Sequence, residues 1–195
     1  MKTSELMDLI QRRRSIFPKF YTGESVPKEI IEEMLEAANW APTHKFTEPW
    51  RFVVFEGEGI QAFANFQAEQ YKLASSVEKF VPDKFEKLKQ KPMKSSHIIA
   101  VGMKRDKDLS LPEVEEICAV ACAVQNMLLV GADRGVGCYW STGGVTYDKE
   151  SKEFFGLGEE DMLLGFIYIG VAESVLKKGR RNPIQEKVTW VTTNK

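Results

Sequence analysis

Cysteine and histidine are scarce in this chain. Its 195 residues include three cysteines and two histidines, His44 and His97. Three cysteines give no disulfide framework, which is typical of proteins kept in a reducing compartment, so we expect a cytoplasmic protein. No C-x-x-C pair occurs, and with so few histidines a transition-metal site is not expected.

An excess of charge of one sign is also missing, and so is a long hydrophobic run. The 27 basic and 28 acidic residues nearly balance, which argues against nucleic acid as the partner. The longest apolar run, 117–132, contains Gln125 and Asn126 and is shorter than the ~20 residues of a membrane-spanning helix. Residues 1–5 lack the apolar core of a signal peptide. We therefore expect neither a nucleic-acid partner nor a membrane.

One domain over residues 1–195 is predicted, because the chain has no internal repeat, low-complexity tract or dividing linker. That length is enough for a proper hydrophobic core. The pattern of apolar residues, prolines and glycines predicts helices at about 4–13, 27–39, 59–75, 83–90, 112–134 and 149–155, and strands near 50–55, 97–103, 137–140 and 162–170.

The end of the first predicted helix carries the triplet Arg13-Arg14-Ser15. Helical spacing relates it to an apolar stripe formed by Leu6, Leu9 and Ile10. At about 100° per residue, Arg13 falls near the middle of that stripe, Arg14 on its flank and Arg12 on the solvent side. A guanidinium in an apolar face needs a partner, and a phosphate suits its planar paired donors and a neighbouring serine hydroxyl.

A simpler alternative for the same triplet is that its arginines only complement the negative pole of the helix dipole. Lys and Arg are common at helix C-termini for that reason. The triplet by itself favours this alternative over an anion site.

A second informative segment is Ala41–Trp50, which follows the helix predicted at 27–39. Pro42 and Pro49 bracket a short run rich in side-chain donors, and neither proline fits inside a regular helix. The apolar run 51–55 that comes next is typical of a strand.

These features occur in an order that resembles the flavin-dependent nitroreductase family, especially its small single-domain bacterial members. Four motifs carry the resemblance and extend from residue 6 to about 172: Arg13-Arg14-Ser15, Ala41-Pro42 to Pro49-Trp50, Gly135-Val136-Gly137-Cys138-Tyr139-Trp140, and Gly165-Phe166-Ile167-Tyr168-Ile169-Gly170. Each motif is weak alone, and the four in sequence are strong.

The resemblance implies an α+β fold with a central, largely antiparallel sheet flanked by helices. It also implies a homodimer in which both subunits build the sites for FMN. In such enzymes a hydride passes from NAD(P)H to flavin N5 and then to nitroaromatics, quinones or other electron-poor acceptors, in a ping-pong sequence. The chain has no Gly-x-Gly-x-x-Gly fingerprint, so the nicotinamide is expected to stack on FMN and not to occupy a Rossmann site.

The same resemblance assigns cofactor-binding roles, and no catalytic side chain, because the flavin carries the chemistry. Arg13, Arg14 and Ser15 match the triplet that holds the FMN phosphate and ribityl chain. Trp40, Thr43, His44 and Lys45 match a loop that reaches the flavin, often that of the other subunit. Trp140, Ser141, Thr142 and Gly143 match the segment beside the isoalloxazine ring, and Arg181 or Arg180 matches a basic residue that reaches the phosphate.

Several of these residues have simpler interpretations. His44 could be a loop histidine satisfied by backbone groups. The run 141–144 could be a plain turn, and the basic run 177–181 could be a solvated surface. Trp40 and Ser141 also stand where some small relatives carry arginines, and Glu48 where many carry Gln, which puts the charge preference of the cavity in doubt.

Two longer segments complete the prediction. In the resembling family, the polar region 57–96 is an excursion that covers the mouth of the active site. The helix at 112–134 is acidic in its first turn and then apolar nearly all round, which suits burial against a second subunit. An ordinary central helix of a monomer is the alternative. Cys118 and Cys122, one turn apart, are interpreted as small core residues and not as a redox pair.

Two other functions stay open at this point. The chain could be a flavin-binding sensor or reservoir without turnover, since a phosphate clamp and ring pocket serve binding equally well. A specialised chemistry of the same family, such as reductive deiodination or a biosynthetic oxidation, would depend on region 57–96.

Overall fold

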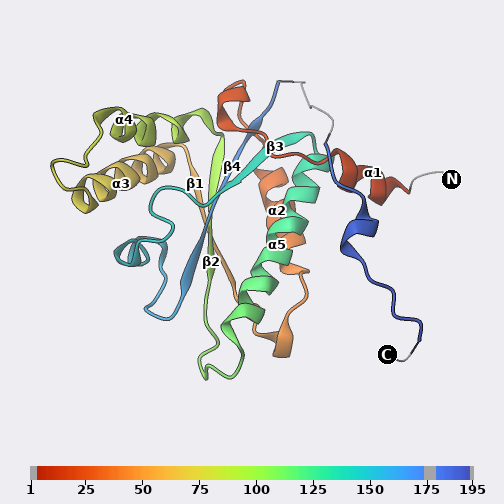
Figure 1. Cartoon of the computed structure of the whole chain (residues 1–195). Helices are drawn as coiled ribbons and strands as arrows, with labels where there is room; N and C mark the ends of the chain where they lie inside the picture. The colour runs from red at the N-terminus through yellow and green to blue at the C-terminus, as the bar shows by residue number, and fades with distance from the viewer. Residues whose placement is uncertain (1–3, 174–178, 194–195) are drawn as a thin grey trace.

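A computed structural model describes residues 4–173 and 179–193 of the chain. A four-stranded sheet lies at the centre, with α2 and α5 on one face and α3 and α4 on the other (Figure 1). The strands are β1 (Trp50–Glu56), β2 (His97–Met103), β3 (Val136–Ser141) and β4 (Met162–Val171). The α-helices are α1 (Glu5–Arg12), α2 (Lys28–Asn39), α3 (Glu58–Ala74), α4 (Pro82–Gln90) and α5 (Glu113–Asp133).

The sheet is antiparallel throughout, in the order β1-β2-β4-β3. Every residue of β2 is buried, because this strand lies between two neighbours and beneath helices on both faces. Its side chains alternate between the faces, so that Ile99 packs with the α2 and α5 layer and Ile98 with the α3 layer. The predicted antiparallel α+β architecture is present.

Helix α5 is the core helix of the first layer. By length and composition alone it could cross a membrane, but Val120, Val124 and Met127 are completely buried against α2 and the sheet. Gly131 allows the end of this helix to approach β3, because a Cβ there would collide with Cys138 Sγ. The long apolar helix therefore belongs to the interior of the fold.

Helix α3 gives the region 57–96 a structural role that the sequence did not indicate. Phe63, Ala64 and Ala68 are completely buried on the second face of the sheet. Phe63 packs against Phe166 of β4 with ring centroids 4.8 Å apart. In contrast, α4 lies beside α3 on the same side of the sheet and has no buried residue (Figure 1). Half of the predicted excursion is thus a layer of the core.

Two local predictions were wrong. Residues 149–155 form two short 3-10 helices, Lys149–Ser151 and Glu153–Phe155, because Gly156 in the left-handed region (φ 69°) ends the turn before an α-helix develops. Cys118 and Cys122 are exposed on α5 and are not core residues of the protomer. The other predicted helices and strands are present, with ends that differ by only a few residues.

Candidate functional site

The first helix ends one residue earlier than the apolar stripe suggests. Arg12 is its last residue, and Arg13 is the C-cap in an extended conformation, with its N–H donating to Leu9 O at 3.0 Å. No residue of α1 is buried, and Leu6 is 62% exposed. The interpretation of Arg13 as a charge inside a buried stripe was therefore wrong for the protomer, because the stripe has no covering layer.

Arg12 nevertheless has different surroundings from Arg13 and Arg14. Arg12 donates from Nη2 to Asp133 Oδ1 at 3.2 Å, and its Nε lies 3.6 Å from Asp8 Oδ2. The pair with Asp133 connects the end of α1 to the end of α5, and the pair with Asp8 lies within α1. Arg13 and Arg14, in contrast, are half-buried and line a cavity. Arg12 is exposed, which confirms its predicted position on the solvent side of the helix.

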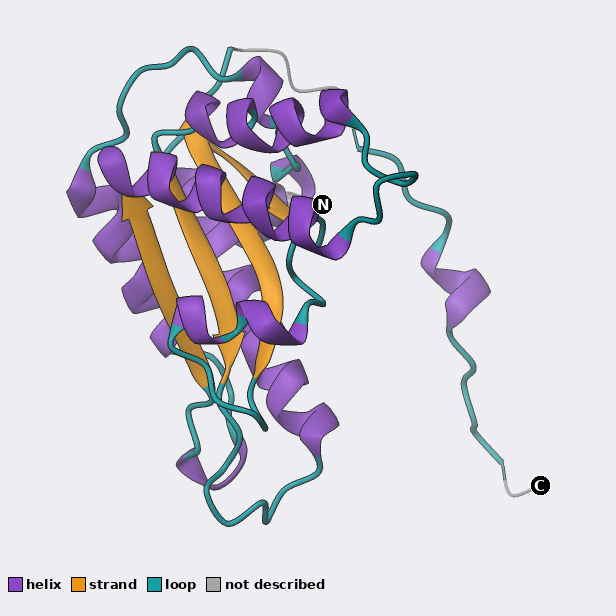
Figure 2. Ribbon diagram, turned by 90° about the vertical axis from the view of Figure 1, so that its left-hand side faces the viewer, coloured by secondary structure: helices purple, strands orange, loops and turns teal. Residues whose placement is uncertain are grey.

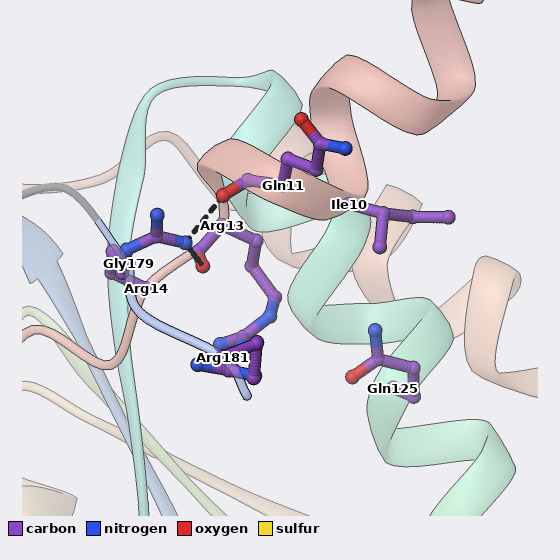
Figure 3. Close-up of a pocket in the computed structure, with 7 residues that line it drawn as sticks. All are labelled: Ile10, Gln11, Arg13, Arg14, Gln125, Gly179 and Arg181. Carbon is purple, nitrogen blue, oxygen red and sulfur yellow. Dashed lines mark hydrogen bonds between the residues drawn. The ribbon is translucent and has the colours of Figure 1, made fainter. Parts of the chain in front are cut away.

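This cavity has a volume of about 630 Å³ and is drawn in Figure 3. Three of its lining residues are arginines, and they come from opposite ends of the sequence: Arg13 and Arg14 after α1, and Arg181 near the C-terminus. None of the lining residues, all within the described part of the chain, is acidic. They are Ile10, Gln11, Arg13, Arg14, Gln125, Gly179 and Arg181.

Contacts with the main chain orient Arg14. Its Nη1 donates to Gln11 O at 2.5 Å and to Arg13 O at 2.6 Å. Gly179 packs directly on the guanidinium, and a Cβ at that position would overlap it. The C-terminal segment therefore lies against the arginine pair because it has a glycine at the point of contact.

Arg181 is the C-terminal arginine that reaches the cavity. Its own Nη1 donates to Arg180 O at 2.8 Å, and Arg180 does not line the cavity. Lys177 and Lys178, also part of the predicted basic run, lie outside the described residues. Three guanidinium groups that line one cavity fit a phosphate dianion, since Arg pairs with phosphate through parallel N–H donors.

Ser15 lies beside the edge strand and not in the cavity wall. It forms an isolated parallel bridge with Cys138 of β3, and the next residue, Ile16, donates its N–H to Cys138 O at 2.9 Å. Ser15 is an exposed residue. Burial raises the pKa of the Cys138 thiol to about 12, and this cysteine is therefore unsuited to act as a nucleophile.

Two hydrogen bonds fix the end of β3 and the segment that follows it. The Trp140 indole N–H donates to Leu164 O at 3.1 Å, and Ser141 is buried. Thr142 and Gly143 are exposed, and Gly143 O accepts a hydrogen bond from Thr146 Oγ1 at 2.9 Å. The polypeptide does turn here, as the simpler interpretation predicted, and it presents small residues to solvent.

Gln67 of α3 packs against this turn, and the sequence analysis did not identify this residue. Its side chain is only 2% exposed, and its Oε1 lies so close to Gly144 that a Cβ there would collide with it. Burial raises the pKa of Tyr168 to about 12, and a hydrogen bond with the Gln67 side chain opposes part of this rise. A polar residue in the apolar half of α3 was the only signal in the sequence.

The 40–45 loop has a constrained backbone. Trp40 is 79% exposed and donates from Nε1 to Glu36 Oε1 at 2.9 Å. Thr43 Oγ1 accepts from the N–H of Glu48 at 3.1 Å. Lys45 has φ 51°, an uncommon value for a residue with a side chain, and its side chain is exposed.

His44 connects this loop to α5. Its Nδ1 lies 2.6 Å from Glu115 Oε2 in the first turn of α5, so its partner is a carboxylate and not the backbone. Glu115 is about 27 Å along the helix from Asp133, at 1.5 Å per residue, and Asp133 is the residue that Arg12 contacts. Gln125, which lines the arginine cavity, is about 15 Å from Glu115 along the same helix, so the His44 loop and the cavity are separated within one protomer.

Comparisons with known proteins agree with this architecture. The nitroreductase family model matches residues 10–171. An Escherichia coli (strain K12) protein named as an NAD(P)H nitroreductase is 31% identical over 189 residues, which cover 96% of this chain and 98% of the relative. The crystal structure of a nitroreductase-like family protein from Bacillus cereus matches with a TM-score of 0.80 and 26% identity, over 98% of each chain.

A structure from Desulfovibrio desulfuricans, described as a nitroreductase in complex with FMN, shares the fold with a TM-score of 0.71 and 22% identity, over 99% of this chain and 100% of that one. The chain belongs to the nitroreductase family and is an enzyme of the oxidoreductase class. Both the family resemblance and the α+β fold that it implied are confirmed.

Proposed function

We propose that this protein binds FMN and uses NAD(P)H to reduce nitroaromatics, quinones or similar electron-poor compounds. The observation that carries the proposal is the cavity that Arg13, Arg14 and Arg181 line together. Related proteins support the same cofactor and hydride donor, since one is named for NAD(P)H and another was crystallised with FMN.

Each part of the chain would have a separate task in that reaction. The three arginines would neutralise and orient the phosphate, and Ser15 would add a hydroxyl beside them. Bound FMN would supply the redox chemistry by accepting a hydride at N5 and passing it on in a ping-pong sequence. The exposed turn at Thr142 and Gly143 would bring small side chains and backbone N–H groups to the edge of the flavin ring, where negative charge develops.

A homodimer would complete the site. Within one protomer the His44 loop contacts the first turn of α5, about 15 Å along the helix from Gln125 of the arginine cavity, so Trp40, Thr43, His44 and Lys45 would reach the flavin of a second subunit. Gln125 belongs to the same exposed stripe of α5 as Cys118 and Cys122, and it lines the cavity. A subunit that covers this stripe would therefore also border the phosphate.

Exposed apolar side chains support the same assembly. Leu6, Met7 and Ile10 of α1 and Val114 of α5 are exposed. The described C-terminal residues 179–193 are all exposed, Trp190 to 85%, and in Figure 2 this segment extends away from the sheet and its helices. Large exposed apolar side chains are typical of an interaction surface, and a second copy of the chain would cover those of α1 and α5.

Thiol labelling with molar-mass measurement tests the dimer. We expect a mass of twice 22.2 kDa in light scattering and slow maleimide labelling of Cys118 and Cys122 in the native protein. Dilution below the dissociation constant should make both thiols react quickly. A particle of 22.2 kDa, or fast labelling of both cysteines within the dimer, would contradict an interface on α5.

The region 57–96 would cover the mouth of the site through α4, since α3 is committed to the core. The protein would act in the cytoplasm, where NAD(P)H is present. Both statements extend the proposal and depend on the binding of the flavin.

Purification and anaerobic titration test the central proposal. The protein should be yellow, with one FMN per chain by mass spectrometry of the released cofactor. Anaerobic addition of NADPH or NADH should bleach it, and a nitroaromatic or quinone should then restore the colour. A yellow protein that neither donor bleaches would indicate a flavin-binding sensor or reservoir, and a protein without affinity for FMN would overturn the assignment.

A further inference from the structure

A second cavity lies where α4 ends beside the segment that follows Ser15. It has a volume of about 460 Å³, and Phe17 and Pro18 form its apolar part. Four lysines surround it, and we call it the lysine pocket. The lysines are Lys19, from the 3-10 helix Pro18–Phe20, and Lys87, Lys91 and Lys94, from the last turn of α4 and the residues after it.

Helical spacing explains how three of these lysines come together. Lys87, Lys91 and Lys94 are four and three residues apart, so they lie on one side of the helix and its continuation. Two other lysines of α4 do not line the pocket: Lys84 lies over the ring of Tyr71 at 4.2 Å and Lys89 over the ring of Phe85 at 5.5 Å. The helix thus separates its lysines into two groups.

Aromatic rings surround the innermost ammonium group. Lys91 Nζ is 4.6 Å from the ring centroid of Tyr168 and 5.1 Å from that of Tyr139. The ring of Tyr139 in turn packs on Phe17, with centroids 4.5 Å apart. Lys91 is half-buried, and this burial lowers its pKa. The lining of the pocket therefore includes the flat ring of Phe17 and the partly desolvated positive charge of Lys91, while Tyr139 and Tyr168 lie behind that lining.

Among the described residues, no carboxylate pairs with the lysines of the lysine pocket. None of the described lining residues is acidic. Arg12, Arg105 and Arg134, in contrast, all have carboxylate partners. Four like charges around one cavity repel one another, and a bound anion would relieve that repulsion.

The helix dipole gives only a partial alternative explanation. Lys87 and Lys91 lie at the C-terminal end of α4, where positive charge is favourable. Lys19 belongs to a different segment, however, and Lys94 lies beyond the last helical turn. A helix-end effect does not account for their convergence on one hollow.

We propose that the lysine pocket binds a small aromatic anion, a flat ring that carries a carboxylate or a similar acidic group. The ring would lie against Phe17 and the aliphatic parts of the lysines, and the acidic group would pair with their ammonium groups. The lysine pocket and the arginine cavity share no lining residue, so this binding site is additional to the proposed flavin site.

Calorimetry with 2-naphthoate and the neutral 2-naphthamide tests the proposal on the protein as purified. We expect one naphthoate per chain, binding that weakens as salt is raised, and naphthamide binding weaker by about tenfold or more. The double variant Lys87→Gln/Lys94→Gln changes only exposed side chains and should weaken naphthoate binding by about tenfold. Lys84→Gln, on the same helix but over Tyr71, is the matched control and should bind as the wild type does.

Further measurements separate this site from the flavin site. The Lys87→Gln/Lys94→Gln variant should keep its flavin content, and Arg13→Gln/Arg14→Gln should keep naphthoate binding while its affinity for FMN falls. Equal binding of naphthoate and naphthamide, an equal loss in Lys84→Gln, or the absence of heat at millimolar naphthoate would each overturn the lysine pocket. Loss of naphthoate binding in the arginine variant would place the ligand in the other cavity and overturn it as well.

Discussion

The indole N–H of Trp140 donates to the main-chain oxygen of Leu164 at 3.1 Å, across a gap of 24 residues in the sequence. Leu164 is the residue left over where the β2–β4 register shifts, because Gly102 pairs with Leu163 and Val101 with Gly165. The bulge therefore supplies an unpaired carbonyl to the indole. This contact fixes the end of β3, from which the proposed flavin-binding turn begins.

The first prediction concerns Gly165, which follows Leu164. Its φ is 122°, and an added Cβ would collide with the main-chain oxygen of Ser141. Gly165→Ala should therefore displace the end of β3, lower the unfolding midpoint in urea and reduce the flavin content. Gly156→Ala is the control, since it also has positive φ (69°) but open space around the Cβ, and it should cost only about 1 kcal/mol. Equal effects of the two variants would show that close approach to Ser141 is unimportant.

The second prediction compares three consecutive arginines. Arg13→Gln and Arg14→Gln should each weaken FMN binding by about ten- to hundredfold, because each removes a charged donor from the proposed phosphate site. Arg12→Gln should leave the FMN affinity unchanged, since Arg12 contacts Asp133 and Asp8. Quenching of FMN fluorescence on titration with apoprotein measures all three. The same loss in Arg12→Gln would mean that general charge, and not the cavity, attracts the cofactor.

The third prediction concerns a buried ion pair between Arg105 and Glu116. Glu116 is 1% exposed, and it also accepts a hydrogen bond from the N–H of Asp106 at 2.7 Å. Arg105→Met would leave this carboxylate without its main partner and should lower the free energy of unfolding by about 3 kcal/mol. Arg134→Met breaks an exposed pair with Glu33 and should change the urea midpoint little. A small loss of unfolding free energy in both variants would show that the buried carboxylate of Glu116 does not need its arginine partner.

The fourth prediction is a loss of stability at alkaline pH. Burial raises the pKa of Cys138 from 9.0 to about 12 and that of Tyr168 from 10.0 to about 12. Above pH 9 the unfolded chain releases the thiol proton while the folded chain keeps it. The free energy of unfolding should therefore fall as pH rises from 9 to 12, by about 1.4 kcal/mol per pH unit for one such group.

Cys138→Ala provides the comparison for this pH profile. The variant should be less stable at neutral pH, because it leaves a small cavity, but its stability should decline less steeply above pH 9. Urea unfolding at a series of pH values gives both quantities. An unchanged slope in the variant would show that the thiol is not a group that links stability to pH.

The elements of the fold were largely predictable because their signals are local. Apolar residues at helical or alternating spacing define α2, α5 and the four strands within the segments themselves. One failure had a local cause, and the others occurred where the signal depended on a covering layer that one protomer does not supply. Residues 149–155 have too little length before Gly156 for an α-helix, and the apolar side chains of α1 and of Cys118 and Cys122 have no covering layer within one protomer.

The sequence by itself determined the membership of a family, through four motifs in a fixed order, and the presence of paired arginines after α1. Tertiary structure alone decided which charges share a space. It brought Arg181 to Arg13 and Arg14 and Lys19 to the lysines of α4, and it left His44 at the far end of α5. The physical reason is that periodicity depends only on residues close in the sequence. Contacts between these charged residues depend on how strands and helices remote in the sequence pack together.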